Sequence, residues 1–251
     1  MVVIRYLPLF FALLWPSYGI SQKKRVLLHG SDETATAIQL LTTQVNQLMA
    51  ETTRLNLEIH DLKSHTGSIY TRWGRTVCPA NGTMLIYNGF AAGNSLNAHG
   101  PADFMCLSAD PVWAKYDDSS QGASSMVYGT EYEFSYQFSD GGAKLFGQNL
   151  QDHDAPCAVC LSSRSLSLMI PGRSECYPGW TKEYAGYIVS GAPSQISPTN
   201  YICLDQNAET ERGDARNDNG KVVYLVEAAC GSLPCPPYVQ NREIPCVVCT
   251  K

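Results

Sequence analysis

The chain has 251 residues, 44% of them hydrophobic and 16% charged, which is enough to bury one or two hydrophobic cores. Its formal net charge of −5 and its scattered basic residues exclude a nucleic-acid-binding protein, which needs a clustered basic face. The even number of cysteines, ten, indicates five disulfides if the chain is exported.

The first residues predict export. Arg5 precedes an apolar run over residues 7–15, and small residues stand at Ser17 and Gly19. This order is typical of a secretory signal peptide over residues 1–19, followed by a short linker over residues 20–30. The run is shorter than the roughly 20 apolar residues that span a bilayer, so we expect a secreted, extracellular protein without a membrane span.

A heptad pattern predicts a coiled-coil helix over residues 31–66. Ser31, Asp32 and Glu33 form a favourable helix start, and Gly67 a plausible stop. Core positions recur at alternating spacings of three and four residues, and all of them are apolar except Thr52. The predicted oligomerisation residues are Ile38, Leu41, Val45, Leu48, Leu55, Ile59 and Leu62. The alternative is a single amphipathic helix packed on its own domain.

Beyond the helix, the chain repeats itself around its cysteines. Each copy has Gly-Arg before its first cysteine, then Tyr-x-Gly-aromatic, then an aromatic residue two positions before the second cysteine, and ends on Pro-Cys-x-Val-Cys. A duplicated unit with cysteines at fixed places predicts an extracellular disulfide scaffold. The shared cysteines are Cys78, Cys106, Cys157 and Cys160 in the first copy and Cys176, Cys203, Cys246 and Cys249 in the second.

The hydrophobic period changes to two after residue 67, which predicts β structure. Residues 128–138 alternate aromatic with small or polar side chains and predict one long half-buried strand. Residues 84–87, 166–170 and 222–226 predict further strands, separated by turn-rich stretches. No helical pattern recurs, so this part is expected to be all-β.

The ordered, duplicated motif set over residues 67–250 resembles the C-terminal non-collagenous domain of collagen IV, and more closely that of sponge-type short-chain collagens. The resemblance implies a mainly β fold of two similar disulfide-linked subdomains, residues 67–163 and 164–251, related by a pseudo-twofold. It also implies self-association into trimers and a role in building matrix. The chain has no Gly-X-Y repeat, so it cannot form a collagen triple helix itself.

The resemblance also implies a disulfide pattern. It joins Cys78 to Cys160 and Cys106 to Cys157 in the first copy, and Cys176 to Cys249 and Cys203 to Cys246 in the second. This leaves Cys230 and Cys235, which have no counterpart in the first copy, to each other.

Two features of the sequence predict different numbers of chains in the oligomer. β-branched residues at one core position with Leu at the other favour a parallel dimer. Thr52 weakens that preference, and the resemblance implies three chains. We therefore favour a trimer over a dimer.

No catalytic, cofactor-binding or metal-binding motif is recognisable. None of the five histidines stands in a nucleophile or zinc motif. The acidic stretch from Asp205 to Asp218 lacks the spacing of a calcium loop and is interpreted as a solvated loop. Two surface motifs stand out: a glycosylation acceptor at Asn81, and the integrin-type tripeptide Arg212-Gly213-Asp214.

The sequence thus predicts a secreted, non-enzymatic matrix or structural protein that associates with itself and needs no cofactor. Matrix proteins or a cell-surface receptor are further candidate partners. The alternative is a secreted recognition protein, lectin-like or immune, which displays several β domains on a coiled-coil stalk and gains avidity from them.

Overall fold

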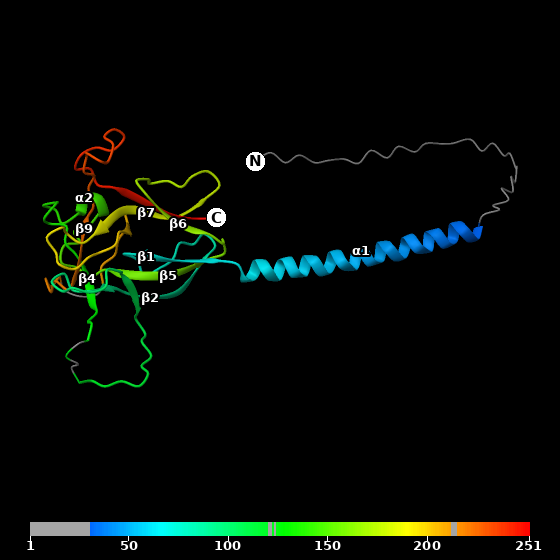
Figure 1. Cartoon of the computed structure of the whole chain (residues 1–251), viewed down its shortest axis with the longest axis horizontal. Coiled ribbons are helices and arrows are strands. Elements are labelled where there is room, and N and C mark those ends of the chain that lie inside the picture. Colours follow the sequence, from blue (N-terminus) through cyan, green and yellow to red (C-terminus); the bar gives the residue numbers. More distant parts are fainter. Residues whose placement is uncertain (1–30, 120–121, 123, 212–214) are drawn as a thin grey trace, which may run out of the picture. The chain divides into compact units, whose positions relative to one another are not determined.

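The computed structural model describes residues 31–119, 122, 124–211 and 215–251. These residues form a mainly β protein with a helix at the N-terminal side and five disulfides (Figure 1). The predicted signal peptide and linker lie outside the described residues. The elements are α1 (Ser31–His65), β1 (Ser68–Trp73), β2 (Thr83–Gly93), β3 (Met105–Ser108), β4 (Tyr128–Tyr132), α2 (Ala143–Phe146), β5 (Pro156–Ser162), β6 (Ser167–Pro171), β7 (Thr181–Ser190), β8 (Ile202–Asp205), β9 (Lys221–Leu225) and β10 (Pro245–Thr250).

Helix α1 begins at the predicted Ser31 and ends at His65, two residues before Gly67. Asp32 and Glu33 lie in its first turn, where their negative charges meet the positive end of the helix dipole. Several threonine hydroxyls donate to the carbonyl four residues earlier, as Thr52 does to Leu48 at 2.7 Å. Within the described part of the chain, no helix combines the length and apolar character needed to cross a membrane.

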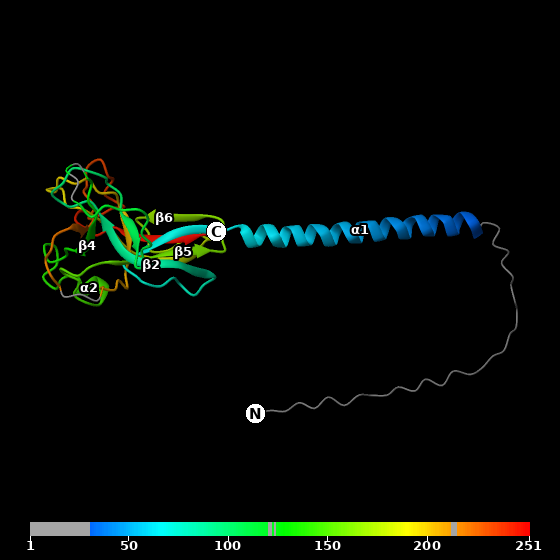
Figure 2. The same ribbon diagram turned by 90° about the horizontal axis from the view of Figure 1, so that it is seen from below.

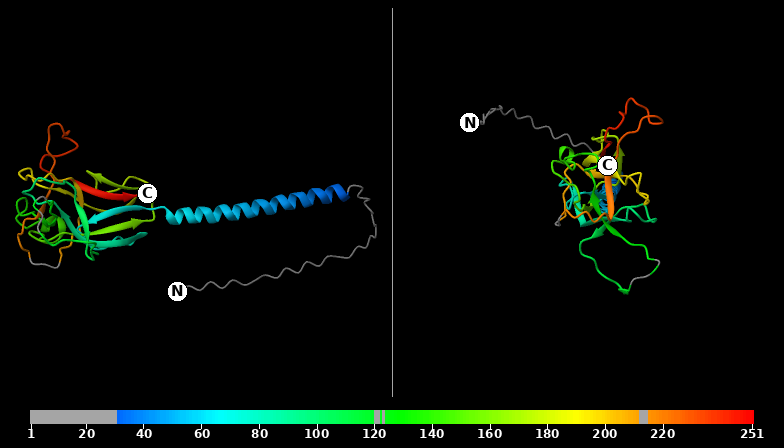
Figure 3. Two further views of the ribbon diagram at one scale, coloured as in Figure 1. Left: turned by 60° about the horizontal axis from the view of Figure 1, so that its bottom comes forward. Right: turned by 90° about the vertical axis from the view of Figure 1, so that its left-hand side faces the viewer.

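The ten strands form one mixed sheet in the order β6-β10-β7-β8-β1-β5-β2-β4-β9, with β3 paired to β2. Figure 2 shows β5 and β6 in the strand-forming part of the chain, the described residues from 68 onward, which we call the β unit. The described parts of the β3–β4 segment, in green, and the β9–β10 segment, in orange to red, project from opposite sides of this unit in Figure 1 and in the right panel of Figure 3.

The two sequence repeats use the same strand pairing. In the first, β5 lies between β1 and β2, and β2 also pairs with β3 and β4. In the second, β10 lies between β6 and β7, and β7 also pairs with β8 and β9. The repeats are joined where β1 meets β8 and where β4 meets β9, both in parallel. Contacts between the copies are therefore part of the same sheet.

The largest core cluster draws on both repeats. It packs Tyr132 and Phe134 of the first copy with Val189, Leu204 and Val223 of the second, and all five side chains are buried. Phe134 stacks on Phe146 of α2 with ring centroids 5.2 Å apart. Residues 58–251 form one compact unit, so the expected subdomains share a core and are not separate bodies.

The long strand predicted over residues 128–138 is wrong in length. Strand β4 ends at Tyr132, and turns over residues 135–141 follow, closed by hydrogen bonds such as Phe138 N to Phe134 O at 2.8 Å. The alternation of exposed and buried side chains also fails, because Thr130 to Phe134 are all buried. The single turn of helix α2 is a second difference from the all-β expectation.

The repeated Tyr-x-Gly-aromatic motif has the same structural cause in both copies. The hydroxyls of Tyr87 and Tyr184 each donate to the carbonyl of the second cysteine, Cys106 or Cys203, at 3.0 Å. A Cβ on Gly186 would lie 1.7 Å from the Leu204 carbonyl oxygen, and one on Gly89 would lie 1.6 Å from its Leu107 counterpart. Glycine is required at this position because backbone atoms of the neighbouring strand occupy the space that a Cβ would need.

Candidate functional site

The predicted oligomerisation residues form an exposed apolar stripe on α1. All seven are solvent-exposed, from 43% for Leu55 to 67% for Leu48. Three further exposed apolar residues, Leu40, Met49 and Leu57, lie outside the 3-4 spacing and widen the apolar surface. Exposing so many large aliphatic side chains on one helix to water is unfavourable in free energy.

The ten cysteines form five disulfides, with the partners that the resemblance implies. In the first copy Cys78 joins Cys160 and Cys106 joins Cys157, and in the second Cys176 joins Cys249 and Cys203 joins Cys246. Cys230 and Cys235 form a local loop between β9 and β10. Each of the four shared bridges stays within its own repeat and ties a distant segment to β5 or β10.

We expect non-reducing peptide mapping of the secreted protein to recover these five pairs. The four longer bridges close loops for which chain entropy gives roughly 4 kcal/mol each of stabilisation. A peptide that links Cys78 to Cys106 would overturn the assignment. A bridge between the two copies would overturn the repeat as a folding unit.

A buried ion pair lies where the two repeats meet. The carboxylate of Glu183 in β7 has no exposed side-chain surface and lies 2.5 Å from Nη2 of Arg164, which stands between β5 and β6. Tyr70 in β1 donates to Glu183 at 2.9 Å, and Thr83 in β2 donates at 3.0 Å. Thr250 in β10 also donates to this carboxylate. Strands of both copies thus converge on one negative charge.

The hydrogen bonds determine the charge state of Glu183. Burial alone would raise its pKa, because desolvation disfavours the charged form. Hydrogen bonds from Thr250 and Arg164, and then from Tyr70 and Thr83, outweigh burial and lower the pKa of Glu183 below its ordinary value. The group is a structural tie, since a charged carboxylate held by four donors has no free lone pair for chemistry.

The acidic stretch interpreted as a solvated loop begins in the core. Asp205 is buried and forms an ion pair with Arg72, with Nη2 and Oδ2 2.7 Å apart. Glu209 is half-buried and pairs with Arg75 at 2.9 Å. The solvated interpretation is therefore wrong for these two residues, which tie the segment after β8 to the end of β1.

The two surface motifs have different outcomes. Asn81 is half-buried between β1 and β2, and its amide nitrogen donates to the Lys182 carbonyl at 3.1 Å. The Thr83 hydroxyl of the same acceptor motif also lies 2.8 Å from the Asn81 side-chain oxygen, so Asn81 and Glu183 share its single proton. Glycosylation of Asn81 stays a prediction. The tripeptide Arg212-Gly213-Asp214 lies outside the described residues.

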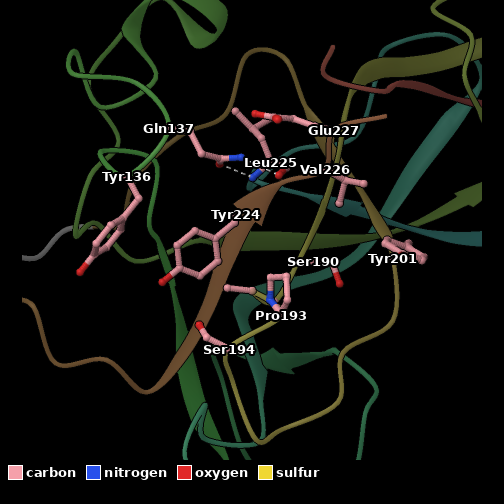
Figure 4. Close-up of a pocket in the computed structure, with 12 residues that line it drawn as sticks. Tyr136, Gln137, Ser190, Pro193, Ser194, Tyr201, Tyr224, Leu225, Val226 and Glu227 are labelled. Carbon is pink, nitrogen blue, oxygen red and sulfur yellow. Dashed lines mark hydrogen bonds between the residues drawn. The ribbon is translucent and has the colours of Figure 1, made fainter. Parts of the chain in front are cut away.

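The β unit carries a tyrosine-lined groove of about 600 Å³ between the β9 end and the segment after β7. Figure 4 shows Tyr136 beside Tyr224, with Pro193 below and Tyr201 on the far side. Gln137 fixes one wall, because its side chain donates to the Leu225 carbonyl at 2.8 Å and accepts from the Leu225 N–H at 2.9 Å. The tyrosine rings of this groove offer aromatic stacking surface.

The structure brings together an acidic cluster that the sequence pattern does not predict. Glu131 and Glu133 occupy the positions of the predicted long strand that were assigned to its polar side, yet each is only 2% exposed. Asp152, from the turn before β5, brings a third carboxylate to the same place. The sequence signal was the pair of acids at alternate positions, and the error was to place that face in solvent.

Comparison with known protein families gives no identification, since no family model matches the chain.

Proposed function

We propose that this chain is a secreted, non-enzymatic structural protein of the extracellular matrix, related to the collagen IV-like C-terminal domains that its motifs resemble. It associates with itself through α1 and through its β unit, with three chains favoured over two. Its two β repeats are related by a pseudo-twofold within one shared sheet.

The observation that carries this proposal is the exposed stripe on α1. Seven aliphatic residues at heptad spacing are exposed in a single chain, and their burial against identical helices would remove them from water. Five disulfides and the absence of a membrane-crossing helix among the described residues are compatible with secretion.

A second surface supports self-association of the β unit. Leu107 in β3 is 40% exposed, whereas its counterpart Leu204 in β8 is 2% exposed. The two strands differ in their surroundings: β8 pairs with β1 as well as β7 and Leu204 packs in the largest core cluster, while β3 pairs with β2 alone. Phe90 and Met105 are exposed beside Leu107, so the first copy presents an uncovered apolar face where the second is closed.

The tyrosine-lined groove favours the alternative, a multivalent recognition protein. Tyrosine rings provide stacking surface with a polar tip, and an oligomer would display one groove per chain. In this alternative α1 is the stalk that clusters weak binding sites.

Fractionation of the source tissue together with a glycan array separates the two functions. A structural matrix protein is expected in the fraction that salt and mild detergent leave insoluble, and to bind no glycan when it is applied as the intact oligomer. Full extraction by salt, together with selective glycan binding that Tyr224→Ala abolishes, would replace the structural function by the recognition function.

A further inference from the structure

Three carboxylates meet inside the first repeat. Glu131 in β4, Glu133 directly after it and Asp152 before β5 each bring a carboxylate oxygen within 4.8 Å of the other two. Oxygen ligands lie 2.3–2.6 Å from a bound calcium ion, so two ligands of one ion are separated by about 5 Å at most. The spacing of the three oxygens therefore fits a single ion between them.

Two of these carboxylates have unsatisfied oxygens. Glu131 Oε2 and Glu133 Oε1 are buried and have no hydrogen-bond partner among the described residues. The same Gln151 amide nitrogen donates to Glu133 Oε2 and to Asp152 Oδ1, at 2.7 Å each. It holds these two carboxylates side by side and leaves Glu133 Oε1 unpaired.

No basic side chain of the described residues forms an ion pair with any of the three carboxylates. Burial raises the pKa of Glu131, and the charges of Asp154 and Asp218 raise it further. Hydrogen bonds from the backbone N–H groups of Asn219 and Asp218 to this carboxylate offset only part of the rise. Burial also raises the pKa of Glu133; the hydrogen bond from Gln151 lowers it in part, and Asp152 raises it further. Buried like charges without a basic partner are costly even when they accept hydrogen bonds, so protons or a cation are needed to neutralise the cluster.

The second repeat has the same backbone here without the charges. Asp152 and Asn241 both adopt a left-handed backbone, with φ of 60° and 61°. Both donate their N–H to the equivalent carbonyl at 2.9 Å, that of Tyr132 for Asp152 and that of Ala228 for Asn241. Gln240 donates to Asn241 as Gln151 does to Asp152.

Of the three acids, only the first has an acidic counterpart. Glu227 stands where Glu131 does, but Ala229 replaces Glu133 and Asn241 replaces Asp152. The backbone around Asn241 thus adopts the same conformation without the two additional carboxylates. Their presence in the first copy alone points to a ligand.

We propose that Glu131, Glu133 and Asp152 bind a calcium ion in the first repeat. The ligand set contains only oxygen, which selects hard cations over zinc or copper. Calcium takes six to eight oxygen ligands in flexible geometry, whereas magnesium requires a near-ideal octahedron. The ion neutralises the unpaired oxygens and ties β4 to the turn before β5.

Isothermal titration of the chelator-treated, full secreted chain with CaCl₂ tests the proposal. We expect one saturable site per chain with a Kd of about 10⁻⁴ to 10⁻³ M, the range of extracellular calcium modules. Glu133→Gln and Asp152→Asn are each expected to weaken binding at least tenfold. Glu227→Gln is the matched control from the second repeat, and its Kd should equal that of the unaltered chain.

Asp152→Asn should fold, because Asn241 occupies the equivalent backbone position, and circular dichroism checks this. The melting temperature of the unaltered chain should rise with CaCl₂ and not with MgCl₂, a readout that needs no variant. Absence of saturable binding below about 10 mM calcium would mean that protons neutralise the cluster, and would overturn the proposal. Equal binding of magnesium, or binding that survives both substitutions, would also overturn it.

Discussion

Replacing Arg164 with methionine is expected to lower the free energy of unfolding of the β unit by about 3–5 kcal/mol. The substitution keeps the unbranched apolar stem of the side chain but leaves the carboxylate of Glu183, which has no exposed side-chain surface, without its cation. It also removes the hydrogen bond from Arg164 Nη1 to the Asn81 carbonyl. Denaturant unfolding under non-reducing conditions measures the loss.

Arg216→Met is the matched control. Arg216 pairs with Asp218 at 3.8 Å, and both side chains are 69% exposed, so the loss should stay below about 1 kcal/mol. Replacing Glu183 and Arg164 together by methionine should recover part of the stability, because no charge then remains buried alone. A loss below 1 kcal/mol in Arg164→Met would show that water reaches Glu183 and that the network does not tie the repeats together.

The same network predicts a pH dependence. The pKa of Glu183 is lowered in the folded protein, so the folded state binds its proton less readily than the unfolded chain. The stabilisation is therefore present above the unfolded pKa of about 4.3 and is lost as pH falls through the lower folded pKa. The difference in stability between the unaltered chain and Arg164→Met should be constant near neutral pH and should shrink below about pH 4.

Gly186→Ala is expected to destabilise the β unit by about 3 kcal/mol or more. The new Cβ would lie 1.7 Å from the Leu204 carbonyl oxygen and 2.7 Å from the Gln206 amide nitrogen. Both neighbours are backbone atoms, so β7 and β8 must separate and the Gly186–Asp205 pairing must be lost. Thermal unfolding of the oxidised protein gives the magnitude.

Gly129→Ala provides the comparison. Gly129 also lies in a strand, but a Cβ there meets no atom within 4 Å, so its substitution should change stability by less than about 1 kcal/mol. Gly89→Ala should resemble Gly186→Ala, because the equivalent contact is with the Leu107 carbonyl oxygen at 1.6 Å. Equal melting temperatures for the Gly129 and Gly186 variants would contradict this explanation of the repeated motif.

The elements predicted best are those set by local pattern. The start of α1 at Ser31 follows from a capping residue and two acids, and the strands predicted at residues 84–87, 166–170 and 222–226 coincide with parts of β2, β6 and β9. Each motif also occurs twice in the chain, so the repeat is recognisable from this sequence alone. The prediction of a mainly β fold after residue 67 is confirmed.

The errors arose where tertiary packing overrides local pattern. The period of two over residues 128–138 predicted that Glu131 and Glu133 face solvent, but segments distant in sequence cover both of them. The local sequence predicts a solvated loop at Asp205, but its partner Arg72 stands 133 residues earlier. A buried acid next to a distant partner leaves no local signal, which is why the acidic cluster and the ion pairs were missed.

The central claim, association through α1, is tested most directly by light scattering on the secreted protein with and without the double substitution Leu48→Asp, Leu55→Asp. The unaltered protein is expected to have three times the mass of one chain. The double variant places charges in the dry seam of every chain, so the helices should separate and the mass should fall. Each chain should still fold, because the disulfides hold the β unit. An unchanged mass in the double variant, or a single-chain mass in the unaltered protein, would contradict the claim.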